Sequence, residues 1–212
     1  MDIGMIAAVL AAILVSMILH ELAHGLVAYL LGDTTAKDEG RLTLNPIKHI
    51  DPIISIALPL LMFIAGGPVF GGAKPVPVDN RKLRWGAFGM ALVAIAGPLT
   101  NFLLALISFV IFYHTGVLAH NDFMGTIAAN FVTINLGFFV FNIIPIPPLD
   151  GSRLLYAIAP DGVRAVMRKM ESTLGIWLVF GLILIFSSFL TTFMSTMISG
   201  IVHFFLMLVG AA

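Results

Sequence analysis

The first long apolar stretch of the chain, Ile3–Leu31, reads IGMIAAVLAAILVSMILHELAHGLVAYLL. A membrane-spanning helix needs about 20 predominantly apolar residues, so this stretch is long enough to cross a bilayer. It also holds three ionisable side chains within five positions, His20, Glu21 and His24. An ionisable group at the centre of a span costs about 2.5–3.5 kcal/mol on insertion scales and by default has a function. The stretch therefore predicts a membrane helix that contains a chemical site.

The composition of the whole chain is that of a membrane protein. Of 212 residues, 59% are hydrophobic and 10% are charged, whereas soluble domains have about 45–50% apolar and 25% charged residues. The mean hydropathy is +1.06. Eleven basic and eleven acidic residues cancel, so the net charge points to no nucleic-acid partner. Because cysteine is absent, any metal must be bound by histidine and carboxylate.

Further apolar stretches predict the remaining helices. Four are long enough to span a membrane: Met90–Tyr113, Met124–Ile144, Thr173–Leu190 and Thr192–Val209. A shorter one, Ile53–Gly66, has Pro59 in its middle and is followed by a strong helix breaker, Gly67-Pro68. We predict an all-α polytopic membrane protein with five full transmembrane helices and a re-entrant hydrophobic hairpin at Ile53–Gly66. The alternative is that this stretch forms a sixth span.

Basic residues distinguish these two alternatives, because Lys and Arg collect in cytoplasmic loops. If Ile53–Gly66 spans, three basic residues lie on one side and eight on the other. If it re-enters, all eleven lie on one side: Lys37, Arg41, Lys48, Lys74, Arg81, Lys82, Arg84, Arg153, Arg164, Arg168 and Lys169. The count favours re-entry, with an external N-terminus and a cytoplasmic C-terminus. Irregular backbone at membrane depth is tolerated only against protein or a wet cavity, so we expect the hairpin beside the functional site.

The two histidines have the spacing of metal ligands. Residues four apart lie on one face of a helix, so His20 and His24 can bind the same ion. Glu21 is displaced around the helix, where it can hold a water on that ion rather than bind it. Catalytic zinc usually has three protein ligands and an open position for water, so a third ligand is needed.

Asp150 is the best candidate for that ligand. It follows the stretch Met124–Ile144 on a segment with three prolines, which stop the helix and stiffen the chain. Gly151 then permits a turn. The alternative is that Asp150 is the N-cap of a helix at Ser152–Ala159. The residues alone favour the ligand by about two to one.

These motifs, in this order, resemble the site-2 protease family of intramembrane zinc metalloproteases. The matching pieces are His20–His24 (HELAH), Ala96–Asn101 (AGPLTN) and Phe141–Gly151 (FNIIPIPPLDG). Gly40–Pro46 followed by Lys74–Val78 resembles the small bacterial and archaeal branch without PDZ or CBS domains. The resemblance covers residues from about 10 to 155 and has high specificity.

The resemblance implies roles for five residues. His20, His24 and Asp150 would bind one Zn²⁺ per chain, and Glu21 would be the catalytic base. Asn142 would lie near the active site, where it contacts the substrate or polarises the scissile carbonyl.

A short β segment is expected near the active site. Leu42, Thr43 and Leu44 have strand-like alternation, and an exposed strand edge can pair with an extended peptide. The family resemblance implies that an unwound substrate pairs there. The alternative is that this segment pairs with Val76–Val78 and covers the hairpin. Gly97 and Asn101 are expected to permit close helix contact rather than chemistry.

The expected protein is a single intramembrane metalloprotease domain over residues 1–212, with a catalytic core at about 3–155 and accessory helices at 173–209. It would be an HExxH-type zinc endopeptidase of a prokaryotic cell membrane, with its active site toward the cytoplasm. It would hydrolyse peptide bonds within or near transmembrane segments, in regulated intramembrane proteolysis. Expected partners are a single-span membrane protein substrate, the lipid bilayer and a regulatory membrane partner, with no nucleic acid.

Two other classes compete with this prediction. A zinc-binding membrane protein without protease activity could be a transporter or an inactive homologue. A transporter should carry ionisable residues on several spans, whereas here they concentrate on one span and one loop. The prenyl-protein-processing metalloproteases take a Glu from a later helix as third ligand, and no later predicted span contains Glu.

Overall fold

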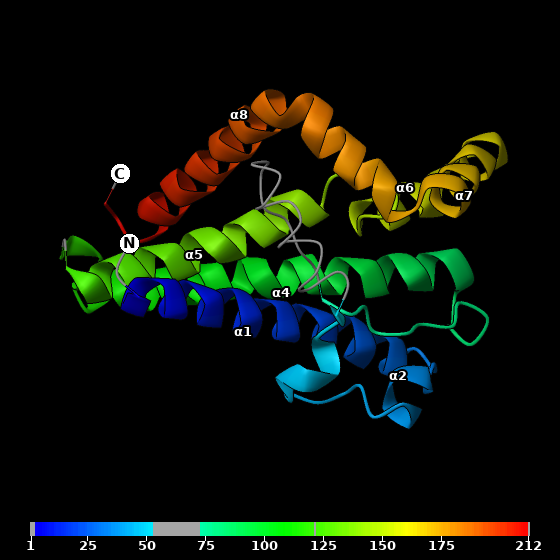
Figure 1. Cartoon of the computed structure of the whole chain (residues 1–212), viewed down its shortest axis with the longest axis horizontal. Helices are drawn as coiled ribbons and strands as arrows, with labels where there is room; N and C mark the ends of the chain where they lie inside the picture. Colours follow the sequence, from blue (N-terminus) through cyan, green and yellow to red (C-terminus); the bar gives the residue numbers. More distant parts are fainter. Residues whose placement is uncertain (1–2, 53–72, 121, 212) are drawn as a thin grey trace.

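The computed structural model describes residues 3–52, 73–120 and 122–211, and within them every regular element is a helix. The elements are α1 (Ile3–Leu30), α2 (Thr35–Asp38), η1 (Pro46–His49), α4 (Gly86–His114), η3 (Val117–Ala119), α5 (Phe123–Asn142), α6 (Gly151–Ile158), α7 (Asp161–Leu174) and α8 (Ile176–Leu208). Figure 1 shows α1, α4 and α5 running alongside one another, with the bent α8 on the α5 side. Helices α6 and α7 lie at the end of the bundle away from the two termini (Figure 1).

Helices α1 and α4 pack closely because each buries a row of mostly small residues, four apart. In α1 the row is Ala12, Ser16, His20, His24 and Ala28. In α4 it is Gly89, Val93, Gly97, Asn101 and Ala105. Residues four apart share one face of a helix, and small side chains let two membrane helices approach closely. The two histidines are therefore buried in the α1–α4 interface.

An apolar cluster joins α4, α5 and α8. Its buried members are Ala105, Phe109, Val132, Leu136 and Phe205. The Phe205 ring is completely buried, and its centroid lies 5.5 Å from that of Phe109 and 5.6 Å from that of Phe102. This packing holds the C-terminal part of α8 against the C-terminal half of α4.

Four helices of the described residues are long and apolar enough to cross a membrane, rather than the five predicted: Ile3–Leu30, Gly86–His114, Phe123–Asn142 and Ile185–Leu208. The prediction of separate spans at Thr173–Leu190 and Thr192–Val209 is not supported, because α8 continues through the predicted boundary at Thr191 and kinks earlier, at Phe186. Thr191 and Thr192 donate their hydroxyls to carbonyls four residues earlier, so they stay within the helix instead of ending it. The bend in α8 falls at Phe186 (φ −111°, ψ 22°).

The continuation of α8 also places the C-terminus at a different end of the bundle from the predicted one. With α8 as one helix, the chain returns to the end of the bundle from which α1 starts (Figure 1). The expectation that the two termini lie on opposite sides is therefore wrong.

The predicted short β segment is also wrong, because neither Leu42–Leu44 nor Val76–Val78 is a strand in the described structure. Backbone groups there are used in local turns and side-chain contacts. The Thr43 N–H donates to the Arg41 carbonyl at 3.0 Å, and the Val76 N–H donates to a carboxylate oxygen of Glu21 at 2.8 Å.

The stretch Ile53–Gly66 lies outside the described residues, so its predicted re-entry is untested. The chain on either side of it meets: the Lys74 N–H donates to the His49 carbonyl at 2.8 Å. Arg41 Nη2 donates to the Lys74 carbonyl at 2.7 Å. The Arg84 N–H then donates to the Leu31 carbonyl at 2.9 Å, so the chain is beside the end of α1 again just before α4 begins.

Asp33 anchors this connection between α1 and α4. Its carboxylate accepts hydrogen bonds from the N–H and hydroxyl of Thr35, at 3.0 and 2.6 Å, and from the N–H of Asp79 at 2.6 Å. Burial raises the pKa of Asp33, but these hydrogen bonds and nearby Lys82 outweigh it and hold the pKa below its ordinary value. The folded state therefore favours the ionised form of this side chain.

Replacing Asp33 by Asn should lower the free energy of unfolding at pH 7 by about 1–3 kcal/mol, because a buried acceptor oxygen becomes a donor. The folded pKa is depressed, so the ionised side chain stabilises the protein above the unfolded pKa of about 3.9. That stability is lost as pH falls through the lower folded pKa. Thermal unfolding in detergent should show that the difference in stability between wild type and variant becomes smaller from pH 7 to pH 3. A stability difference that does not change with pH would contradict this role of Asp33. The control is Asp38→Asn, because Asp38 is exposed.

Candidate metal centre

Three side chains that can bind a metal meet between α1 and the segment after α5. His20 Nε2 lies 3.0 Å from His24 Nε2, and Asp150 Oδ2 lies 3.2 and 3.3 Å from these two nitrogens. In a tetrahedral zinc site with bonds of about 2.0–2.2 Å, ligand atoms are about 3.3–3.6 Å apart. The triangle is therefore close in size to one face of a zinc tetrahedron.

The hydrogen bonds of the imidazoles leave both Nε2 atoms to bind a cation. His24 Nδ1 lies 2.8 Å from the Val93 carbonyl, which can only accept, so Nδ1 carries the proton. His20 Nδ1 lies 2.6 Å from Asn101 Oδ1. In a neutral imidazole the other nitrogen then has a lone pair. Two lone pairs and a carboxylate at this separation repel one another, so the arrangement calls for a cation, and this donor set fits zinc.

Gly97 provides the space beside these nitrogens. A Cβ at this position of α4 would lie 2.4 Å from His24 Nε2 and 2.6 Å from His20 Nε2. Only glycine therefore allows α4 to pass this close to the coordinating atoms. The sequence pattern indicated close helix contact at Gly97, and the structure shows that the contact is with the rings of His20 and His24.

Replacing Gly97 by Ala should weaken zinc binding by about tenfold or more, because the added methyl group would displace imidazoles that other residues hold in place. Zinc can be measured by elemental analysis of the detergent-purified protein after equilibration with a zinc buffer. Gly137→Ala on α5 is the matched control, since a Cβ there meets no atom within 4 Å. Equal zinc contents in the two variants would argue against this role of Gly97.

Asp150 reaches the histidines through a compact segment after α5. Successive turns place it there, with hydrogen bonds from the Leu149 N–H to the Ile146 carbonyl and from the Ser152 N–H to the Leu149 carbonyl. A Cβ at Gly151 would lie 2.1 Å from the Ile143 carbonyl oxygen, so this fold-back needs glycine.

The direction of the Asp150 side chain bears on its two alternative roles. The residue occupies the N-cap position of α6, but its side chain makes no capping hydrogen bond and faces the two imidazoles instead. Burial raises the pKa of Asp150, but the two neighbouring imidazoles lower it more, to about 2. The carboxylate is therefore ionised, as a metal ligand must be.

Glu21 lies next to the metal-binding group without belonging to it. One of its carboxylate oxygens, Oε2, accepts the Val76 N–H at 2.8 Å. This donor is a neutral backbone N–H, so it orients the carboxylate without neutralising its charge, which suits a proton acceptor.

The structure shows the hydrogen bonds of two asparagines that the sequence singled out. In the described part of the chain, the Asn142 amide donates to the Phe138 carbonyl of its own helix at 3.0 Å, rather than to the metal-binding group. Its predicted role stays a prediction. Asn101, expected to serve only helix contact, instead accepts from His20. The sequence signal that could have indicated this is a polar amide inside the apolar stretch Met90–Tyr113.

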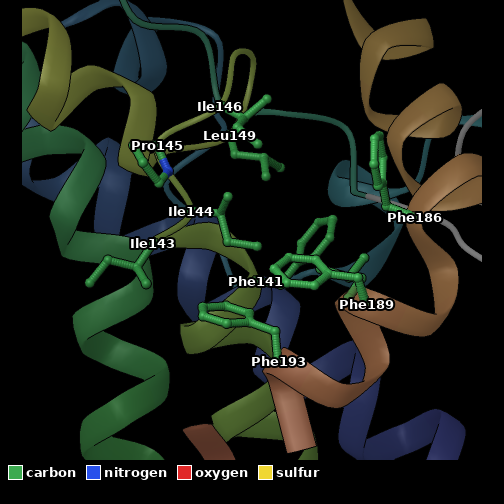
Figure 2. Close-up of a pocket in the computed structure, with 10 residues that line it drawn as sticks. Phe141, Ile143, Ile144, Pro145, Ile146, Leu149, Phe186, Phe189 and Phe193 are labelled. Atoms are coloured by element: carbon green, nitrogen blue, oxygen red, sulfur yellow. The ribbon is translucent and has the colours of Figure 1, made fainter. Parts of the chain in front are cut away.

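An apolar cavity of about 310 Å³ lies beside the segment that carries Asp150 (Figure 2). One wall is formed by the end of α5 and the following segment, including Phe141 and Leu149, the residue before Asp150. The opposite wall is formed by residues of α8, among them Phe186 and Phe189, and the Phe189 ring points toward the first wall (Figure 2). Every lining residue is apolar, so the cavity can take an apolar group.

Helices apolar enough to cross a membrane and a His–His–Asp group that can hold an ion together indicate a metal-binding membrane protein. No family model and no solved structure matches the chain. The chain is 44% identical over 170 residues to "Putative zinc metalloprotease YwhC" of Bacillus subtilis, an alignment that covers 76% of this chain and 73% of that protein.

Two relatives named "Putative zinc metalloprotease Rip2" are also similar. The one from Mycolicibacterium smegmatis is 34% identical over 151 residues, covering 70% of this chain and 56% of the relative. The one from Mycobacterium tuberculosis (strain H37Rv) is 31% identical over 179 residues, covering 83% and 67%. The chain belongs to the site-2 protease-like family of zinc metalloproteases, and its cofactor is Zn²⁺.

Proposed function

We propose that this protein is an intramembrane zinc endopeptidase of a prokaryotic cell membrane. Its substrate would be a single-span membrane protein, cut within or near the transmembrane segment. The observation that carries the proposal is the convergence of His20, His24 and Asp150 among helices apolar enough to cross a bilayer. A metalloprotease that cuts soluble substrates would not need apolar helices around its metal site, because water and polar substrates reach an exposed site freely.

The residues around the metal have separate tasks in this reaction. Bound zinc supplies Lewis-acid polarisation and lowers the pKa of a bound water to about 7. Glu21 takes a proton from the attacking water on its carboxylate and later delivers it to the leaving amine. Asn142 would donate to the scissile carbonyl, which requires its amide to leave the Phe138 carbonyl.

The cavity beside Asp150 supports an apolar substrate. The described residues of its walls are all apolar, and a transmembrane segment offers mainly apolar side chains. Because Leu149 both lines the cavity and adjoins Asp150, a substrate side chain in the cavity would bring its backbone toward the metal-binding group.

The distribution of basic residues supports an active site near the cytoplasmic face. All eleven Lys and Arg residues fall between α1 and α4 or within α6 and α7. Lys and Arg accumulate on the cytoplasmic side of membrane proteins. His24 and Asp150 lie toward this same end of the bundle.

The test compares the membrane proteins of host cells that contain the wild-type protein or no protein. Mass spectrometry of new N-termini should find fragments that begin within or beside a transmembrane segment, only with wild type. A zinc chelator should remove these termini, and they should return when zinc is restored. A zinc-loaded wild-type protein that generates no such termini would favour a zinc-binding protein without protease activity.

A further inference from the structure

A line of buried amides connects α5 to the metal centre. Asn101 and Asn135 are both completely buried. Asn101 Nδ2 donates to Asn135 Oδ1 at 2.9 Å, and Asn135 Nδ2 donates to the Phe131 carbonyl at 2.9 Å. With the contact between Asn101 Oδ1 and His20 Nδ1 at 2.6 Å, the line runs from α5 through α4 to α1.

The direction of these hydrogen bonds is set at the end away from the metal. The Phe131 carbonyl can only accept, so Asn135 must turn its nitrogen toward it and its oxygen toward Asn101. Asn101 then presents its nitrogen to Asn135 and its oxygen to His20. The Ser16 carbonyl, a longer second acceptor at 3.3 Å from the same Asn101 nitrogen, favours the same orientation.

The orientation of Asn101 determines which nitrogen of His20 carries the proton. With an acceptor oxygen before it, His20 Nδ1 must carry the proton, and the lone pair is then on Nε2, which faces His24 and Asp150. If Asn101 were reversed, its NH₂ group would face Nδ1 and the proton would move to Nε2. The imidazole could then not bind a metal at Nε2 without losing that proton.

We propose that Asn101 and Asn135 are positioning residues that fix the tautomer and ring orientation of His20 for zinc. Hydrogen-bonding partners beyond the ligands commonly change metal affinity by about 10–100-fold. Two buried amides are also costly unless both are satisfied, and apolar side chains would fill the same space without that cost. The proposal rests on the metal centre and not on peptide hydrolysis.

The same helix also leads to the third ligand. Asn135 lies on α5, and Asp150 follows the end of that helix. Docking of α5 against α4 therefore determines both the tautomer of His20 and the position of the carboxylate. Zinc binding and the packing of α5 are coupled through these two contacts.

The test measures metal binding rather than activity. Asn135→Leu should weaken zinc binding by about 10–100-fold in competition with a chelator. It should also change the visible spectrum of the Co²⁺-substituted protein, and ¹⁵N NMR of labelled histidine should show that His20 is no longer uniformly protonated at Nδ1. Asn130→Leu is the matched control, because Asn130 lies on another face of α5 and its amide nitrogen is 3.8 Å from Met5 Sδ.

A conservative variant separates hydrogen bonding from packing. Burial favours the neutral form of a carboxyl group, and in Asn135→Asp the neutral O–H can donate to the Phe131 carbonyl while the other oxygen accepts from Asn101. Asn135→Asp should therefore bind zinc within about threefold of wild type at pH 6, a small part of the 10–100-fold range above. Wild-type zinc affinity and tautomer in a folded Asn135→Leu protein would overturn the proposal, as would an Asn135→Asp protein as weak as the Leu variant. If zinc binding follows these expectations but no proteolysis is found, only the proposed function fails.

Discussion

Replacing Glu21 by Gln is expected to abolish peptide hydrolysis while leaving zinc bound. The Gln side chain has the same size and can still accept the Val76 N–H that now bonds Glu21 Oε2. It cannot take up a proton from water or pass one to the leaving amine. Loss of a general base typically lowers the rate by about 10²–10⁴-fold, so kcat should fall by at least that amount.

Two measurements on the same detergent-purified protein check this prediction. Zinc content should equal that of wild type, and cleavage of a substrate identified from the membrane-protein comparison should be lost. Glu39→Gln, an exposed carboxylate next to α2, should leave both unchanged. Cleavage by the Glu21 variant at a rate near that of wild type would remove Glu21 from the role of base.

The second large effect is expected for Asp150→Asn, which should weaken zinc binding by more than about 100-fold. An amide oxygen is a poor ligand for zinc, and the two imidazoles that remain cannot complete a site of three protein ligands. The loss should exceed that of Gly97→Ala or Asn135→Leu, because those residues act through the histidines rather than on the metal.

Chelator competition on the purified protein measures this affinity, with the exposed Asp161→Asn on neighbouring α7 as control. Thermal unfolding in the presence of a chelator separates the ligand role from a helix-capping role. A ligand loses its effect on stability when zinc is removed, whereas a cap keeps it. Undiminished zinc in Asp150→Asn, together with lower stability in chelator, would make Asp150 a cap.

The local features of this protein were readable from its sequence. The length and apolarity of Ile3–Leu31 predicted α1, and the four-residue spacing of His20 and His24 predicted their shared face. Both follow from the rise and period of a helix, which depend only on nearby residues. Breakers were readable where proline or glycine provided them, as at the end of α5.

Helix boundaries were harder to predict where no proline or glycine marks them, as in the region that forms α8. Two apolar stretches of span length predict two helices, but Thr191 and Thr192 donate to carbonyls of their own helix and α8 continues past them, with its kink at Phe186. Alternation at Leu42–Leu44 likewise predicted a strand that did not form. A strand needs a partner, and the neighbouring segment uses the N–H of Val76 to hold Glu21.

Only the tertiary structure decided how the metal centre is supported. The hydrogen bond between His20 and Asn101 joins residues 81 positions apart, and the contact between His20 and Asp150 joins residues 130 apart. Neither the closeness of Gly97 to the imidazoles nor the link from Asn135 leaves a periodic signal, because each depends on how separate helices dock. The sequence by itself therefore determined the chemical groups of the site, and the packing of α4 and α5 against α1 determined their protonation and geometry.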